Sequence, residues 1–284
     1  MSDTGPAFLT TKEVADLLRV KERKVYDLAG EGEIPHRRIT GKLLFPRAEL
    51  LAWIEGRSLE RPAVLAGSHD PLLDWAVRES ECGLALLTGG SLDGLARFAR
   101  GEAALAGLHI PDQGGWNLQA VQAEGLSDCV LIHWARRARG LILSEAMAPR
   151  VAGLADLRGR RVALRQAAAG TAQLWQRLLD DAGLDAADFT VAGVARSESD
   201  AAAMVAEGQA DAALGLAAMA RQFGCDFLPL IDESFDLLID RRSYFTAPVQ
   251  RLLGMAGKPA LTEKAATMGG YDLSDLGAVR WLSA

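Results

Sequence analysis

The sequence predicts an α/β protein that consists of a small N-terminal domain and a larger second domain. Its 284 residues are 49% hydrophobic, which is enough for one sizeable core and a small companion. From residue 62 onward, short apolar runs alternate with helix-like segments, as in an α/β fold with largely parallel sheets. A polar, proline-containing stretch, "EGRSLERPAV", separates the two patterns. We therefore place the first domain at residues 1–56, a linker at 57–61 and the second domain at 62–284.

Charge and cysteine content narrow the class of protein. The net charge of −6 argues against a protein that is basic over its whole surface and coats nucleic acid. Residues 1–57 carry 10 Lys and Arg against 9 Asp and Glu, so the acidic excess lies in the second domain. No apolar run reaches about 18 residues, and the N-terminus lacks the pattern of a signal peptide. Three scattered cysteines without C-x-x-C spacing are interpreted as buried thiols. We expect a cytoplasmic protein without a membrane segment.

Two short helices are predicted near the N-terminus. Thr10 and Glu13 form a capping box, because the hydroxyl and the carboxylate can each satisfy a free backbone N–H, so a helix begins near Thr11. After the turn "RV", a second helix is predicted from Lys21 to Ala29. Two short helices joined by a tight turn form a helix-turn-helix.

The chemistry of the second helix and of the segment after it favours DNA. In this motif the N-terminal residues of the second helix enter the major groove. Next, "IPHRRITGKLLF" alternates around Thr40-Gly41, which predicts a two-residue hairpin, or wing, with cations for phosphates. Pro46 is expected at the first position of a third helix, from which Leu50, Leu51, Trp53 and Ile54 pack back. The candidate DNA contacts are Lys21, Arg23, Lys24, Tyr26, Arg37, Arg38 and Lys42.

Residues 8–54 closely resemble the excisionase-type, MerR-like winged helix-turn-helix, without a gap. The resemblance implies binding to double-stranded DNA. One departure is Lys21, where the family commonly has a Ser or Thr cap. Lysine cannot accept the capping hydrogen bond, so the start of the helix is less stable, but the surface gains another cation. The alternative is a small helical docking module whose cations are merely solvated.

Small polar residues follow several strands of the second domain. In open α/β sheets ligands bind at the carboxyl ends of strands, where a helix N-terminus offers free N–H donors and about half a positive charge. Three such junctions converging would form an anion pocket without a lysine. The glycines of "LLTGGSLDGL" lack the lysine of a P-loop, so a sensing pocket is favoured over a nucleotide enzyme. The junctions are Gly67-Ser68-His69-Asp70, Gly89-Gly90-Ser91 and Ala169-Gly170-Thr171.

The order of these junctions resembles the type II periplasmic-binding-protein-like domain of cytoplasmic regulators. The resemblance rests on "GSHDPLLD", "GGSLDGLARFARGEAALAGLHI", "ARRARGLIL", "LRQAAAGTAQLW" and "VAEGQADAALGL". It implies two lobes that close on an effector, lobe one at 62–135 and 240–284 and lobe two at 140–230. Relatives are usually linked to molybdate or tungstate. Where the family tends to read R-Q-x-G-S-G-T-R, this chain has "RQAAAGTA", so a hydroxyl and a guanidinium are missing and the ligand could be less charged or larger.

Several candidate ligand residues have a plain structural alternative. Ser68 and Ser91 could be helix caps, and Asn117 is expected to cap a helix rather than reach a ligand. His69 and His109 lack the spacing of a metal site, so a hydrogen bond to the ligand or to a loop, or a structural role, is favoured for each. Arg139 is either a pocket cation or a surface residue. The candidate ligand contacts are Ser68, His69, Ser91, His109, Arg139, Arg165, Gly170 and Thr171.

No set of catalytic residues emerges, since G-x-S-x-G and H-E-x-x-H are both absent from the sequence. We expect no cofactor and no metal. The function favoured is a transcription regulator that binds operator DNA as a homodimer and senses a small anion such as molybdate, tungstate or another oxyanion. The alternative is an enzyme or carrier of molybdenum-cofactor metabolism with a helix-turn-helix-like docking module.

Overall fold

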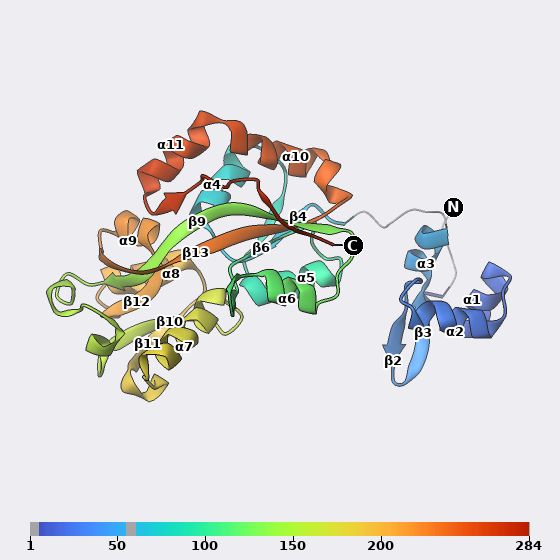
Figure 1. The fold of residues 1–284 in the computed structure, drawn as a ribbon, viewed down its shortest axis with the longest axis horizontal. Coiled ribbons are helices and arrows are strands. Elements are labelled where there is room, and N and C mark those ends of the chain that lie inside the picture. The colour runs from blue at the N-terminus through green and yellow to red at the C-terminus, as the bar shows by residue number, and fades with distance from the viewer. Residues whose placement is uncertain (1–5, 55–60, 284) are drawn as a thin grey trace. The chain divides into compact units, whose positions relative to one another are not determined.

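The computed structural model describes residues 6–54 and 61–283, and the chain forms two compact units, residues 1–60 and 61–284 (Figure 1). Most of the linker predicted at 57–61 lies outside the described residues. Arg61 is described, and it packs within the larger unit, where its guanidinium lies 4.2 Å from the Phe98 ring and 3.1 Å from the Asp240 carboxylate.

The smaller unit is a helix-turn-helix followed by a hairpin and a third helix. Its strands form an antiparallel sheet in the order β1-β3-β2. The capping box is confirmed, since Thr10 and Glu13 bond to each other's backbone N–H, and Arg19 in the left-handed conformation ends the first helix. In chain order the elements are β1 (Phe8–Thr10), α1 (Thr11–Leu18), α2 (Glu22–Gly30), β2 (Arg37–Ile39), β3 (Lys42–Pro46) and α3 (Arg47–Ile54).

The start of α3 differs from the prediction. Pro46 ends β3, and Arg47 is the first helical residue, with its N–H bonded to the Ala7 carbonyl. Pairing with β1 holds Pro46 in the sheet, which a proline tolerates beside a strand end. The side chains of Trp53 and Ile54 are exposed instead of packing back. The core of this unit consists of Leu9, Val14, Ala15, Val25, Ala29, Ile34, Phe45 and Leu50.

The larger unit is organised around one ten-stranded sheet in the order β11-β10-β12-β9-β13-β6-β4-β5, with β14 and β15 also paired to β9. β7 and β8 form a separate hairpin. The strands are β4 (Val64–Gly67), β5 (Ala85–Leu87), β6 (Leu105–Leu108), β7 (Pro111–Asp112), β8 (Gly115–Trp116), β9 (Cys129–Leu143), β10 (Arg161–Arg165), β11 (Thr190–Ala195), β12 (Ala212–Leu216), β13 (Asp226–Asp240), β14 (Tyr271–Asp272) and β15 (Val279–Leu282).

Helices cover both faces of the sheet. The α-helices are α4 (Pro71–Glu79), α5 (Ser91–Ala99), α6 (Leu118–Ala123), α7 (Gly170–Ala182), α8 (Glu198–Ala206), α9 (Ala217–Phe223), α10 (Ala247–Gly254) and α11 (Pro259–Met268). Short 3-10 turns occur at Ala148–Arg150, Leu154–Leu157, Ala186–Asp188, Ser243–Phe245 and Met255–Gly257. None of the helices among the described residues is long and apolar enough to cross a bilayer.

The expectation of largely parallel sheets is wrong for the centre of the sheet. β4, β5 and β6 are parallel, and so are β10, β11 and β12, but the strands β9 and β13 pair antiparallel along their whole 15-residue lengths. We call the part around β4–β6 lobe one and the part around β10–β12 lobe two. Because β9 and β13 run through both, each lobe shares its central strands with the other (Figure 1).

The apolar runs of β9 reflect burial on both faces, as expected for a central strand. In lobe one, Ile132 and Trp134 face the helices α4, α10 and α11, while Leu131 faces α5 and α6. In lobe two, Leu141 faces α7 and Ile142 faces α8 and α9. Between these apolar ends β9 carries "ARRAR", where the two lobes meet. Of the predicted buried thiols, two are buried and Cys225 is partly exposed, and all three are free.

The separation of the two units predicts a local response to a core truncation. Phe45→Ala should remove about 3–5 kcal/mol from the stability of the smaller unit, because it deletes a fully buried ring. Hydrogen exchange followed by mass spectrometry should then show lost protection in peptides of α1 and α2 and unchanged protection in β9 and β13. Phe8→Ala, at a ring 43% exposed, is the matched control. Equal loss of protection in both units would contradict two independent cores.

Candidate functional site

The exposed surface of α2 and of the β2–β3 hairpin holds all seven candidate DNA contacts. Lys21 is the N-cap of α2 and makes no side-chain cap bond, and Tyr26 is 55% exposed. Val25 and Ala29 fix the orientation of α2 by packing into the core, so Arg23 and Lys24 remain in solvent. Within residues 6–54 neither of these two cations makes an ion pair.

The hairpin forms as the sequence predicts. Thr40 and Gly41 have φ of 47° and 80°, the type I′ geometry that matches the twist of two paired strands. Arg38 and Lys42 are exposed, whereas the guanidinium of Arg37 lies 3.0 Å from the Glu49 carboxylate. The hairpin therefore presents two unpaired cations among the described residues and one that is partly neutralised.

In the larger unit, loops from the two lobes meet at the starts of α5 and α7. The Gln166 amide donates to the Gly89 carbonyl at 3.0 Å, and the Leu92 N–H donates to the Ala168 carbonyl at 3.2 Å. Gly90, at φ 102°, leaves no room for a side chain, since a Cβ there would lie 2.5 Å from the Ala168 oxygen. The lobes are in direct backbone contact.

Beneath this contact, two arginines of β9 share one carboxylate of β13. Arg137 lies opposite Glu233 in the sheet and donates to it, and it also donates to Asp70 at 2.9 Å. The Nε of Arg139 lies 2.6 Å from the same Glu233, which accepts a bond from Nδ1 of His109 at 3.1 Å. All five side chains are at most 2% exposed. Glu233 thereby links the charged centre of β9 to lobe one.

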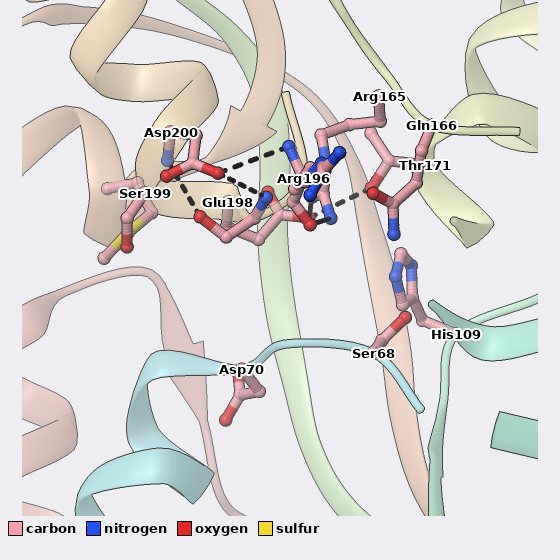
Figure 2. A network of polar contacts seen from close by, with 12 residues as sticks. Ser68, Asp70, His109, Arg165, Gln166, Thr171, Arg196, Glu198, Ser199 and Asp200 are labelled. Atoms are coloured by element: carbon pink, nitrogen blue, oxygen red, sulfur yellow. Dashed lines mark hydrogen bonds and ion pairs between the residues drawn. The ribbon is translucent and has the colours of Figure 1, made fainter. Parts of the chain in front are cut away.

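A second carboxylate, Glu198, occupies the lobe-two side of the cluster. It pairs with Arg139 at 3.2 Å and with Arg165 at 2.5 Å, and it accepts a hydrogen bond from the Thr171 hydroxyl at 3.0 Å. Figure 2 shows Glu198, Arg165 and Thr171 of lobe two facing Ser68, Asp70 and His109 of lobe one. Glu198 is the first residue of α8, so its carboxylate also lies at a helix N-terminus.

Two further polar groups continue the cluster into lobe one. The Ser68 and Ser91 hydroxyls are 2.8 Å apart, and Ser91 accepts from the His109 N–H at 3.0 Å. Gly170 abuts the His109 carbonyl, because a Cβ there would overlap that oxygen. Asn117 occupies the N-cap position of α6 at φ 70°, as predicted, but its side chain makes no cap bond: its amide bonds inward to Asp236 and to the Ile110 N–H. The Asn117 side chain therefore orders the end of β6 rather than the start of α6.

The cluster is charge-balanced. Burial raises the pKa of Glu198, but Arg139 and Arg165 lower it more, so that pKa lies well below its ordinary value. Burial likewise raises the pKa of Glu233, but Arg137 and Arg139 lower it more, so that this pKa also lies well below its ordinary value. Burial lowers the pKa of His109, so this imidazole is neutral at pH 7, with its proton on the Nδ1 that faces Glu233. Three guanidinium groups therefore oppose three carboxylates, those of Asp70, Glu198 and Glu233.

The structure brings together seven of the eight candidate ligand residues and separates one. Ser68, Ser91, His109, Arg139, Arg165, Gly170 and Thr171 all lie in the cluster. His69 does not: its Nε2 lies 3.9 Å from Asp74 on the outer side of α4. Ser68 and Ser91 are not N-caps, because Asp70 caps α4 and Gly90 precedes α5. Arg139 is buried rather than a surface residue.

Sequence reasoning missed the residues that neutralise the arginines. Arg137 and Arg139 are two positions apart on a strand, so they share a face. Charges buried in such a strand need carboxylate partners, and "LPLIDESFDLLI" carries three carboxylates, Asp232, Glu233 and Asp236, between apolar residues. That signal could have found Glu233. Asp70 belongs to a junction that the sequence singled out, but it was not named as a partner of an arginine. Glu198 lies at an ordinary helix start and carries no comparable signal.

Two polar groups of the cluster lack a partner. The Nε atoms of Arg137 and Arg165 are buried without a hydrogen-bond acceptor in the part of the chain that the structure describes. The described residues contain no group of three or more His, Cys, Asp or Glu arranged to hold a metal ion. The cluster is therefore a set of fixed donors and acceptors with spare donor capacity.

Family models match both units. A helix-turn-helix domain model matches residues 8–58, and a PBP superfamily domain model matches residues 74–257. Both describe binding domains rather than enzymes. An uncharacterized protein of Bacillus subtilis strain 168, YvgK, is 26% identical over 264 residues, which cover 82% of this chain and 85% of that protein.

Solved structures share the fold of the larger unit at low identity. PhnD1 from Prochlorococcus marinus MIT 9301, in complex with methylphosphonate, has a TM-score of 0.53 at 12% identity and covers 76% of this chain and 92% of its own. A phosphate-bound substrate-binding protein of Clostridium perfringens has a TM-score of 0.53 at 10% identity, with coverages of 72% and 96%. With the superfamily model spanning well over half of its residues, the chain belongs to the PBP superfamily and carries a helix-turn-helix domain in front of that fold.

Proposed function

We propose that this protein is a transcription regulator whose helix-turn-helix domain binds operator DNA and whose PBP-like domain binds a small effector. The observation that carries the proposal is the presence of both domains in one chain. One recognition helix contacts one half-site, so we propose a homodimer on an inverted repeat. We therefore propose that the protein acts in the cytoplasm, the compartment that holds the operator DNA.

The DNA contacts we propose are those of α2 and the hairpin. Arg23 and Lys24 lie in the first turn of α2, the part of a recognition helix that meets base edges, and both are unpaired among the described residues. Arg38 and Lys42 extend from the hairpin, where cations meet phosphates. Arg37 must exchange Glu49 for a phosphate, so its contribution is smaller.

We propose an anionic effector. The buried Nε donor of Arg165 has no acceptor among the described residues, and an acceptor-rich ligand would satisfy it. PhnD1 and the Clostridium protein were solved with methylphosphonate and phosphate, respectively. Molybdate, tungstate or another oxyanion could bind between Arg139, Arg165 and Thr171. The Glu198 carboxylate holds that position, so the anion must displace it.

The recognition surface predicts a defect in DNA binding. The double variant Arg23→Ala, Lys24→Ala should bind DNA from upstream of its own gene at least tenfold more weakly. The slope of log affinity against log salt concentration should fall by about 4, because the homodimer loses two cations from each protomer and these no longer displace counterions. Fluorescence anisotropy at several salt concentrations measures both quantities. Arg158→Ala, Arg160→Ala removes the same charge from exposed positions of the larger unit and should bind normally. Equal affinity of the two double variants would refute the proposed surface.

The oxyanion proposal predicts competition with Glu198. In Glu198→Gln the net charge of the cluster rises from zero to +1, so molybdate should bind about tenfold more tightly than to the wild type. Isothermal titration calorimetry measures this, with Glu207→Gln, an exposed carboxylate at the C-terminal end of the same helix, as the control. If neither the wild type nor Glu198→Gln binds molybdate, tungstate or sulfate, the effector is not a bare oxyanion.

The depressed pKa of Glu198 also predicts a pH dependence of stability. A carboxylate whose pKa is lowered on folding contributes stability that is fully present above the unfolded value of 4.5 and is lost as pH falls below it. Glu198→Gln should therefore cost about 3–5 kcal/mol at pH 7, where it leaves two buried guanidinium groups undercompensated, and less at acidic pH. Denaturant unfolding at several pH values tests this. If the difference in free energy of unfolding between wild type and variant were the same at every pH, ionised Glu198 would be excluded as its cause.

A further inference from the structure

A cavity of about 520 Å³ lies beside the arginine cluster, on the outer side of α4. Its walls come from three helices, α4 of lobe one, α9 of lobe two and α11, which packs against both, together with Ser199 at the start of α8 (Figure 1). The volume lies within the range of small-molecule sites in proteins. The lining residues are His69, Pro71, Asp74, Trp75, Arg78, Ser199, Ala218, Arg221, Gln222, Lys264, Thr267 and Met268.

The charge of this cavity is opposite to that of the domain around it. Three cations, Arg78, Arg221 and Lys264, line it against one carboxylate, Asp74, although the chain as a whole carries −6. Asp74 lies 3.5 Å from Arg78 and accounts for that one cation. Within the described part of the chain, neither Arg221 nor Lys264 makes an ion pair or a hydrogen bond. The cavity therefore has two cations without a counter-charge.

A histidine nitrogen adds to these cations. The Nδ1 atom of His69 is buried and has no hydrogen-bond partner among the described residues. A buried ring nitrogen without a partner is costly, and the cost is recovered when a ligand bonds to it. The sequence placed His69 with the other candidate ligand residues, whereas the structure places it in the lining of this cavity.

One side of the cavity is apolar. Trp75 contributes a large aromatic ring, and Pro71, Ala218 and Met268 add apolar atoms. The Nζ of Lys264 lies 6.0 Å from the centre of the Trp75 ring, so a cation and an aromatic face are presented side by side. A bare oxyanion would leave this surface uncovered, whereas a flat apolar body would stack on it.

We propose that this cavity is a binding site for an organic anion, a flat apolar body that carries one carboxylate or sulfonate. The anionic group binds Arg221 and Lys264, the body stacks on Trp75, and an acceptor or donor of the ligand meets His69. Because α4 and α9 belong to different lobes, the bound ligand ties the lobes together on this side. The site is separate from the arginine cluster, so it goes beyond the proposed oxyanion effector and does not depend on it.

Fluorescence titration of the full chain with anilinonaphthalene sulfonate, against its uncharged analogue N-phenylnaphthylamine, tests the site. The two dyes share the aromatic body, and only the first has the sulfonate. The sulfonate should bind at about one dye per chain and at least tenfold more tightly than the analogue, since it gains the two free cations. Arg221→Ala and Lys264→Ala should each weaken the sulfonate about tenfold and leave the analogue unchanged, whereas Trp75→Ala should weaken both.

Lys258→Ala, an exposed cation directly before α11, is the matched control and should leave both dyes unaffected. Equal affinity of the two dyes, or sulfonate binding that survives Arg221→Ala and Lys264→Ala, would overturn the proposed site. Displacement of the dye by sulfate at constant ionic strength would show that bare oxyanions fill the cavity and would also overturn it. Because dye binding is measured without DNA, a failure of the proposed regulation and a failure of the cavity site are told apart.

Discussion

The arrangement of the large unit depends on the burial of three arginines at the boundary between its lobes. An unpaired buried guanidinium costs several kcal/mol, so these side chains are tolerable only because carboxylates from both lobes meet them. Glu233 reaches Arg137 and Arg139 from the neighbouring strand, and Glu198 reaches Arg139 and Arg165 from lobe two. Each lobe therefore supplies charges that the other must balance, and these ion pairs fix the position of one lobe relative to the other.

This constraint shapes what the domain can recognise. A PBP-like cleft lined by three cations would attract anions strongly, but here the charges cancel and only individual donors remain free, such as the Nε atoms of Arg137 and Arg165. Beside the cluster, the cavity formed by α4, α9 and α11 is lined by two cations, Arg221 and Lys264, that make no ion pair among the described residues.

Local signals in the sequence predicted the smaller unit well. The Thr10–Glu13 capping box and the Thr40-Gly41 hairpin depend on residues close in the chain, and both form as predicted. Pro46 was misplaced because its pairing with the distant β1 overrides its preference for a helix start. Trp53 was expected inside from its apolar character alone, which does not specify the face of a short helix.

The candidate site was predictable in part. Strand ends and helix starts identified Ser68, Ser91, Gly170 and Thr171, which do converge, because the carboxyl ends of parallel strands meet in any such fold. Arg139 lies inside the antiparallel strand β9, so this rule did not place it. The partners of the arginines were not predictable in the same way, since Arg137 and Glu233 are 96 positions apart and their pairing depends on the antiparallel register of β9 and β13. Asn117 shows the same limit: the contact that fixes it, Asp236, comes from the far end of the chain.

Recognition of specific DNA sequences is the property on which the proposed regulation rests. Purified full-length protein incubated with sheared genomic DNA, followed by sequencing of the retained fragments, tests it most directly. We predict strong enrichment of a few intergenic sites that share an inverted repeat with half-sites one helical turn apart. Retained fragments with the same distribution as the input DNA would contradict it.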